Sequence, residues 1–285
     1  MALIQDQRKY NTRFAFWRSR FLRIFPIYWI ILALSVLASV FITEYGRPYL
    51  RSSLEYAPLN VSLVGLDLIV LFTLVGGFTT TANIVVPQSW TLSLEIYFYL
   101  CVPWLSRMKT RPLAVMCTSI LTLKLLLFFI FELQDPWSYR FFPLEIGFFL
   151  WGMLMYRLHL KVPKYSEYVV LVFWLFAGLY RWGSPIHNSA SMIFPLLLGL
   201  TLGEFAKWDR FSVVRMLGKI SYPLYLTHAL VGTLVLIFLG RLDVSIGIWW
   251  RYVLILACTL AVSVGLIRFV ESPIDRVREK LASRN

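Results

Sequence analysis

Two arginines near the N-terminus have the type and spacing to bind phosphate. Arg20 and Arg23 are three residues apart at the start of an apolar stretch, so in a helix they lie on one face at a membrane boundary. Guanidinium groups bind phosphate through two parallel hydrogen bonds, and two guanidiniums can share one phosphate. The pair is therefore a candidate site for a phosphate-bearing donor such as an acyl-CoA. The alternative is an ordinary basic anchor on the cytoplasmic side of a membrane span.

A carboxylate lies near the outer end of a later apolar stretch. Glu95 follows Trp90 and Ser93 within two helical turns. A central Asp costs roughly 2.5–3.5 kcal/mol on insertion scales, so Glu95 needs a cationic or hydrogen-bonding partner, or water. One interpretation gives Glu95 a catalytic role in proton or acceptor handling, with Trp90 and Ser93 beside it on the acceptor side. The other is a structural ion pair.

His228 is the histidine expected inside an apolar stretch, about 10 Å from its cytoplasmic end. Histidine exchanges a proton near neutral pH, which suits a general base or a proton relay. The alternative is an interhelical hydrogen bond that fixes packing. Lys124 also falls within an apolar stretch and needs a partner, for which Asp67, Glu95 and Glu145 are the candidates.

Several kinds of site are not indicated. Cys101, Cys117 and Cys258 lie inside apolar stretches without metal or disulfide spacing. No metal-ligand cluster, Gly-rich phosphate loop or familiar catalytic triad is present, so we expect neither a metal nor a tightly bound cofactor. The net charge of +13 comes from basic residues concentrated in short loops. This distribution sets membrane orientation and does not indicate nucleic-acid binding.

The composition predicts an all-α, polytopic transmembrane helical bundle. Of the 285 residues, 59% are hydrophobic and only 15% are charged, too few to cover a soluble surface. Because about 20 apolar residues cross the hydrocarbon layer, we searched for runs of that length bounded by charge, Pro or Gly. The candidates are 24–43, 61–78, 89–106, 113–131, 141–156, 168–182, 191–205, 221–239 and 248–269.

The positive-inside rule then selects the number of crossings. Nine crossings would place the basic loop at 107–111 outside and invert every later loop. The segment 61–78, which carries Asp67 and three glycines, is therefore predicted to be re-entrant or interfacial. Eight crossings leave 21 basic residues inside and six outside. We expect a multi-pass protein of the plasma (inner) membrane, surrounded by the lipid bilayer, with both termini in the cytoplasm.

Four ordered motifs resemble acyltransferase family 3, the bacterial integral-membrane O-acyltransferases. The motifs are Arg-x-x-Arg running into Ile-x-Pro-x-Tyr-Trp; Trp-Ser-Leu-x-x-Glu-x-x-Phe-Tyr, with Thr91 in the Ser place; Ser-Tyr-x-Leu-Tyr-Leu-x-His; and Glu-x-Pro. The matching residues are Arg20, Arg23, Ile24, Pro26, Tyr28 and Trp29 in the first motif; Trp90, Leu92, Glu95, Phe98 and Tyr99 in the second; Ser221, Tyr222, Leu224, Tyr225, Leu226 and His228 in the third; and Glu271 and Pro273 in the fourth.

The resemblance implies a function. Family members move an acyl group, usually acetyl, from cytoplasmic acyl-CoA to a hydroxyl of a surface polysaccharide or another extracytoplasmic or lipid-linked acceptor, and the arginines would hold the donor. Members begin with two further spans, the first carrying a catalytic histidine, and neither is found here. We therefore expect residues 1–285 to form a single membrane-embedded domain, N-terminally incomplete relative to the family.

The source of proton transfer is consequently open. His228 could supply it, a partner chain could supply it, or the chain could be truncated. Two further readings compete with an active transferase. Intramembrane Lys124, Glu95 and His228 would also fit a transporter or flippase for a glycan or lipid-linked substrate, although no internal repeat supports that reading. The last alternative is an inactive remnant.

Overall fold

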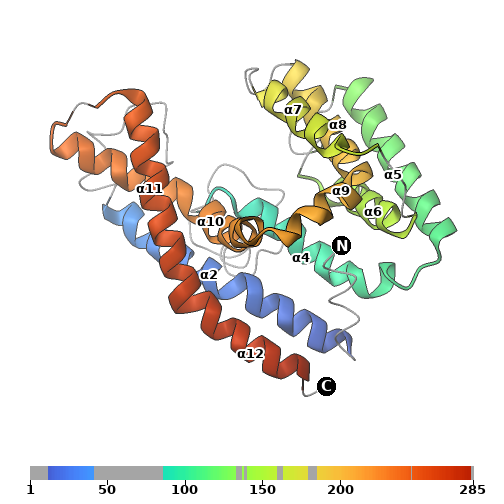
Figure 1. Cartoon of the computed structure of the whole chain (residues 1–285), viewed down its shortest axis with the longest axis horizontal. Coiled ribbons are helices and arrows are strands. Elements are labelled where there is room, and N and C mark those ends of the chain that lie inside the picture. The colour runs from blue at the N-terminus through green and yellow to red at the C-terminus, as the bar shows by residue number, and fades with distance from the viewer. Residues whose placement is uncertain are drawn as a thin grey trace. The chain divides into compact units, whose positions relative to one another are not determined.

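The computed structural model of the chain is mostly helical in the part that it describes. The described residues are 12–41, 86–132, 137, 140–158, 163–178, 185–244 and 246–283, and none of them is in a β-strand. The segment 61–78, predicted to be re-entrant or interfacial, lies outside these residues. Figure 1 shows the helices in chain order, coloured from the N-terminus to the C-terminus.

Within the described residues, each of the other eight apolar stretches lies mostly in helix. Two of these helices start well before the apolar run: the stretches predicted at 24–43 and 221–239 belong to helices that begin at Arg13 and Ser212. Hydropathy marks the apolar part of a helix, whereas the helix itself continues through polar turns. The helices are α2 (Arg13–Phe41), α4 (Ser89–Leu105), α5 (Thr110–Phe129), α6 (Phe142–Leu158), α7 (Ser166–Gly178), α8 (Pro185–Leu200), α9 (Leu202–Ala206), α10 (Ser212–Arg241), α11 (Ile248–Leu266) and α12 (Ser272–Ser283), with a 3₁₀ turn η3 (Lys207–Arg210) and a π-helical turn η4 (Ile267–Glu271).

Four helical stretches of the described chain are long and apolar enough to cross a membrane. They are Arg13–Ala38, Thr110–Phe129, Ser212–Arg241 and the continuous stretch Ile248–Glu279. Helices α4 and α6, with 17 residues each, and the shorter α7 and α8 fall below that length. The helical membrane architecture agrees with the prediction, while the count of eight crossings and the cytoplasmic termini stay predictions.

The chain divides into two compact units. In the described part, unit 1 comprises residues 97–215, and unit 2 comprises residues 12–41, 86–96 and 216–283. The boundary falls inside α4, between Ile96 and Tyr97, and again inside α10, between Arg215 and Met216. The single membrane-embedded domain stays a prediction.

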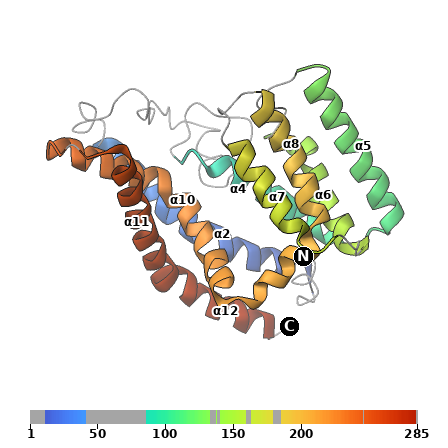
Figure 2. The ribbon, with the colours of Figure 1, turned by 45° about the horizontal axis from the view of Figure 1, so that its top comes forward.

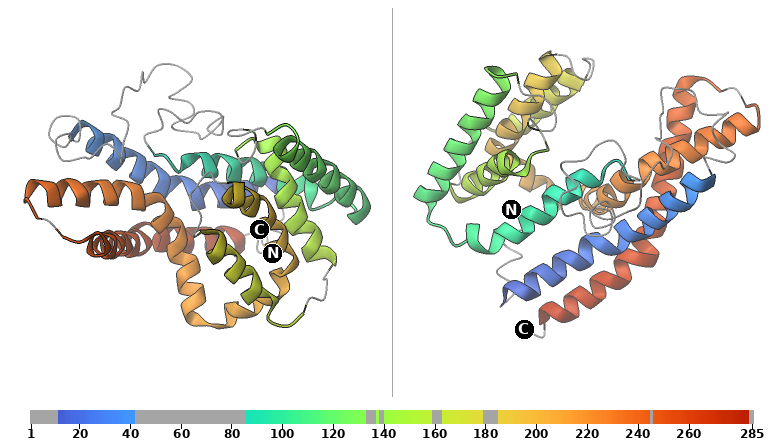
Figure 3. Two further views of the ribbon diagram at one scale, coloured as in Figure 1. Left: turned by 90° about the horizontal axis from the view of Figure 1, so that it is seen from above. Right: turned by 180° about the vertical axis from the view of Figure 1, so that it is seen from behind.

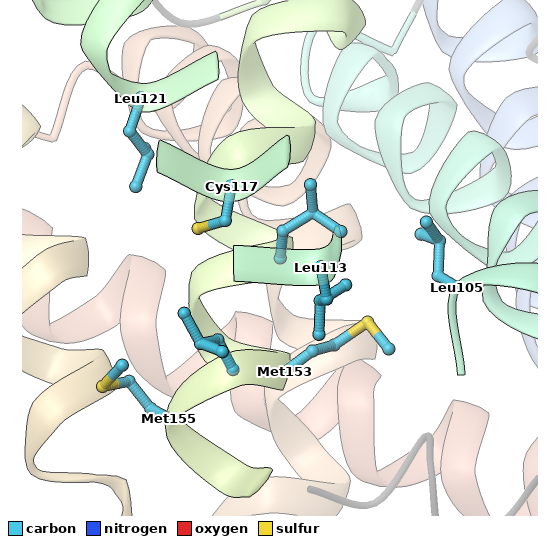
Figure 4. Close-up of a cluster of buried hydrophobic side chains, with 8 residues drawn as sticks. Leu105, Leu113, Cys117, Leu121, Met153 and Met155 are labelled. Atoms are coloured by element: carbon cyan, nitrogen blue, oxygen red, sulfur yellow. The ribbon is translucent and has the colours of Figure 1, made fainter. Parts of the chain in front are cut away.

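The core of unit 1 lies between α5 and α6. Leu113, Cys117 and Leu121 follow each other at four-residue intervals along α5, which places them on one face. Figure 4 shows this face toward Met153 and Met155 of α6. The helices approach closely at Gly147, where a Cβ would lie 3.0 Å from Cγ2 of Ile120. The α5–α8 helices of this unit can be followed in Figure 2.

Arg157 closes the end of α4 within unit 1. Its guanidinium donates hydrogen bonds to the carbonyl oxygens of Met108 at 2.5 Å, Ser106 at 2.8 Å and Leu105 at 3.2 Å. These carbonyls lie at or just beyond the last turn of a helix, where no further helical N–H is available to them. Arg157 therefore joins the end of α6 to the α4–α5 connection.

Unit 2 is built from α2, the start of α4, α10 and the long α11–η4–α12 rod. Helices α10 and α11 are joined by the short connection 242–247, and α11 continues through η4 into α12. Both η4 and α12 pack against α2. The right-hand view of Figure 3 shows blue α2 and red α12 running side by side. This arrangement brings the fourth motif, at the η4–α12 junction, to the helix that carries the first.

Candidate active site

His228 has one ring nitrogen fixed by the backbone of its own helix. Its Nδ1 atom lies 2.7 Å from the carbonyl oxygen of Tyr225. A carbonyl can only accept a hydrogen bond, so Nδ1 carries the proton and, in the neutral ring, Nε2 carries the lone pair. The side chain is exposed, and the Tyr225 ring lies beside it at 5.9 Å between centroids. This tautomer is the one in which Nε2 can accept a proton.

Gln88 links the start of α4 to the same turn of α10. Its Nε2 atom donates to the carbonyl oxygen of Tyr225 at 3.2 Å and lies 3.5 Å from that of Leu226. It is also 3.5 Å from Nδ1 of His228, but two N–H donors cannot bond to each other, so this is a contact only. Two carbonyl acceptors fix the amide orientation. Gln88 thus positions the backbone that holds His228.

A second polar link joins the same two helices. The hydroxyl of Thr91 lies 2.9 Å from the carbonyl oxygen of Gln88 and 3.1 Å from the hydroxyl of Tyr225. Thr91 has a single proton, so all three groups are satisfied when it donates to Gln88 and accepts from Tyr225. The second and third motifs are therefore connected through Gln88, Thr91 and Tyr225.

The other predicted residues of α4 lie on the same two turns. Ser93 is fully buried, with 0% of its surface exposed, whereas Trp90 and Glu95 are partly exposed. By helical spacing Glu95 shares a face with Thr91, four residues earlier. Unit 2 therefore holds Trp90, Ser93 and Glu95 on the helix whose first turn contacts the His228 turn.

The first motif is tied to the third by a tyrosine hydroxyl. Tyr222 donates to the carbonyl oxygen of Ile24 at 2.6 Å, across 198 residues of sequence. Tyr222 precedes His228 by six residues and Ile24 follows Arg23 directly. The contact places Ile24, and with it Arg23, beside Tyr222 of α10. Tyr222 is about 9 Å from His228 along that helix.

The two predicted donor arginines differ in their surroundings. Arg20 is only 2% exposed and lies over the Phe16 ring at 5.3 Å, one helical turn away. Arg23 is exposed and lies near Glu271 of the fourth motif. Both belong to unit 2 and lie about 60° apart around α2, because a spacing of three residues turns the helix by about 300°.

Glu271 has a different partner set from the one that its sequence position predicts. A spacing of three residues would favour a local pair with Arg268 in an α-helix, but Arg268 is exposed and the charged neighbours of Glu271 are Asp275, Arg23, Arg278 and Lys219. The expected spacing holds for an α-helix, whereas residues 267–271 form a π-helical turn in which hydrogen bonds run from i to i+5. The fourth motif therefore faces the first.

Lys124 pairs with Glu145, which resolves the three-way choice left by the sequence. The ammonium forms an ion pair with the carboxylate, and Lys124 is 1% exposed while Glu145 is 12% exposed. The ammonium also lies 4.5 Å from the centre of the Phe148 ring. The pair joins α5 to α6 inside unit 1, so it has a clear structural role.

Several contributors were not assigned roles from the sequence. Gln88, Tyr225 and Tyr222 lie inside or beside the motifs, but only the fold shows that they connect helices. Lys219 and Arg278 lie outside the motifs, and their shared position around Glu271 depends on the packing of three separate elements. Among the described residues, no group of three His, Cys, Asp or Glu side chains is placed to hold a metal ion.

The apolar helices define the chain as a membrane protein, and sequence comparison identifies its family. The family model described as an acyltransferase domain (Acyl_transf_3) matches residues 1–268 and thus includes the first three motifs. The chain belongs to acyltransferase family 3. No curated protein and no solved structure gives a significant match. The resemblance drawn from the motifs is confirmed, and the chain is a membrane protein of an acyltransferase family.

Proposed function

We propose that this chain transfers an acyl group, acetyl in the first instance, from cytoplasmic acyl-CoA to a hydroxyl of an extracytoplasmic glycan or lipid-linked acceptor. The observation that carries the proposal is the 2.7 Å contact between Nδ1 of His228 and the Tyr225 carbonyl oxygen, from which we infer that Nδ1 carries the proton. An exposed imidazole with its Nε2 lone pair available is the group that the reaction requires. The family supports the reaction class.

In the proposed reaction, Nε2 of His228 takes the proton of the acceptor hydroxyl. The acceptor oxygen attacks the thioester carbonyl carbon, and the resulting tetrahedral intermediate collapses as the C–S bond breaks. The imidazolium then returns its proton to the leaving thiolate. The products are an acyl ester and CoA, with no change in oxidation state. Arg20 and Arg23 are assigned to the donor, and Trp90, Ser93 and Glu95 to the acceptor side.

The donor and the base occupy different levels of unit 2. Lys219, near Arg23 through their shared neighbour Glu271, is nine residues before His228 on α10, or about 14 Å along the helix. A donor that binds by its phosphates at the arginines must therefore reach His228 with an extended arm. An acyl-CoA has this form, with its phosphates and thioester at opposite ends.

The Lys124–Glu145 ion pair weakens the transporter alternative. This alternative depended on Lys124, Glu95 and His228 acting as a relay, but the charge of Lys124 is compensated by Glu145 between α5 and α6. A buried pair of this kind has a sufficient structural explanation. A relay would then rest on Glu95 and His228 without Lys124.

The test is acyl transfer by membranes that contain this chain. Membranes are incubated with acetyl-labelled acetyl-CoA and a surface-glycan fraction, with Arg23→Ala and the matched variant Arg18→Ala, an exposed arginine on the same helix. We expect label in the glycan with wild type and Arg18→Ala, and a loss of about tenfold or more at low donor concentration with Arg23→Ala. Glycan movement without label transfer would favour a transporter, and neither activity would favour a remnant or a missing partner chain.

A further inference from the structure

A cluster of basic side chains surrounds Glu271 at the cytoplasm-facing end expected for α2. Arg23 comes from α2, Lys219 from α10 and Arg278 from α12, and all three lie near the Glu271 carboxylate. These three helices are far apart in the sequence. We call Arg23, Lys219, Arg278 and Glu271 the basic cluster.

Arg278 is held in place by α2 and by its own helix. Its Nε atom lies 3.3 Å from the Ser19 hydroxyl, and its guanidinium pairs with Asp275, three residues earlier. Ser19 and Arg23 are four residues apart, so they share one face of α2. Arg278 therefore reaches the face of α2 that carries Arg23.

Two of the basic groups have hydrogen-bonding capacity to spare. Arg23 and Lys219 are exposed, and within the described residues their side chains have no hydrogen bond to another group. The Oε2 atom of Glu271 is buried and also lacks a hydrogen-bond partner in the part of the chain that the structure describes. Arg23 and Lys219 are near enough to Glu271 to interact with it electrostatically, but they form no direct hydrogen bond with it. Such an arrangement can accept a further anion.

We propose that the basic cluster is one phosphate-binding site, in which Lys219 and Arg278 join Arg23 in holding the phosphates of the acyl-CoA donor. The inference rests on the proposed function and adds two residues to the donor site. Three bases against Glu271 and Asp275 leave an excess positive charge, which a phosphate neutralises. The C-terminal helix α12 thereby becomes part of the donor site.

The test is direct binding, measured apart from catalysis. The full chain is placed in phosphatidylcholine nanodiscs, and binding of CoA and of inorganic pyrophosphate is measured for Lys219→Gln, Arg278→Gln and the control Arg276→Gln, an exposed arginine of α12. We expect about tenfold weaker binding of both probes to the first two variants and wild-type binding to the control. Lys219→Gln removes no hydrogen bond within the described residues, so we expect this variant to fold like the wild type. Thermal unfolding of each variant checks that the protein is folded.

The contrary results are distinguishable. CoA binding that depends on Arg23 but is unchanged in Lys219→Gln and Arg278→Gln would overturn the enlarged site and leave the proposed function standing. Absence of CoA binding to the wild type would overturn both. Pyrophosphate binding that disappears when phosphatidylglycerol is added, without competition by CoA, would assign the cluster to lipid headgroups and overturn its donor role.

Discussion

The Nδ1 atom of His228 lies 2.7 Å from the carbonyl oxygen of Tyr225, and Gln88 donates to the same carbonyl at 3.2 Å. One backbone oxygen therefore fixes both the tautomer of the proposed base and the start of α4. The third family motif and Gln88, two residues before the second motif, meet at this atom.

Substitutions of Gln88 should show whether its side chain donates to the carbonyl oxygens of α10. Gln88→Glu places a carboxylate oxygen against the carbonyl oxygens of Tyr225 and Leu226, whereas Gln88→Met removes the donor without adding repulsion. We expect acyl transfer to fall more in Gln88→Glu than in Gln88→Met, by about tenfold or more. Transfer rates at saturating donor, with protein amounts matched by immunoblot, provide the measurement. Equal rates in the two variants would show that Gln88 does not donate to these carbonyls.

The Lys124–Glu145 pair should be structural. Replacing either partner alone leaves a buried charge uncompensated, which costs about 3–5 kcal/mol. Lys124→Met and Glu145→Leu should each lower the unfolding temperature in detergent strongly, while the double variant should recover most of the loss because both charges are gone. A double variant as unstable as the sum of the single variants would contradict a pairwise interaction.

Gly199 should not tolerate a methyl group. A Cβ at this position would overlap Nε1 of Trp151, and that nitrogen donates to the carbonyl oxygen of Leu196 at 2.9 Å. We expect Gly199→Ala to destabilise the protein by about 1–3 kcal/mol. Gly152→Ala is the matched control, since a Cβ there would have no neighbour within 4 Å. Thermal unfolding of both variants measures the difference, and equal unfolding temperatures would contradict the packing of Trp151.

The orientation can be tested with single cysteines. In a cysteine-free background, we expect cysteines at Lys109 and Arg276 to react with an impermeant maleimide only after the cytoplasmic side is opened, and a cysteine at Asp243 to react in intact spheroplasts. The reason is the excess of basic residues predicted inside. Labelling at Lys109 from the outside would invert the loops and contradict eight crossings.

The helices were largely predictable because the apolar runs of the sequence fall within helices. The starts of α2 and α10 were not, since Arg18 and Arg20 continue α2 upstream of its apolar run, and Ser212 begins α10 nine residues before Ser221. Periodicity reports only the apolar segment, and a polar turn of helix has no comparable signal.

The candidate site was predictable to the level of motifs and not to the level of contacts. Arg20, Arg23, Trp90, Ser93, Glu95 and His228 all fall in unit 2. However, the partner of Lys124 could not be selected among three acids, because the choice depends on how α5 packs against α6. The neighbours of Glu271 were not predicted because residues 267–271 form a π-helical turn. In such a turn, residues three apart lie farther apart around the helix axis than in an α-helix.

The most direct test is the rate of acetyl transfer by His228→Asn, compared with wild type and with the control His159→Asn, whose position lies outside the described residues. CoA binding is measured in the same preparations. We predict that His228→Asn loses transfer by a factor of about 10²–10⁴, as expected for removal of a general base, while CoA binding and the His159→Asn rate are unchanged. A His228→Asn enzyme that transfers acetyl at the wild-type rate would contradict the assignment of His228 as the base.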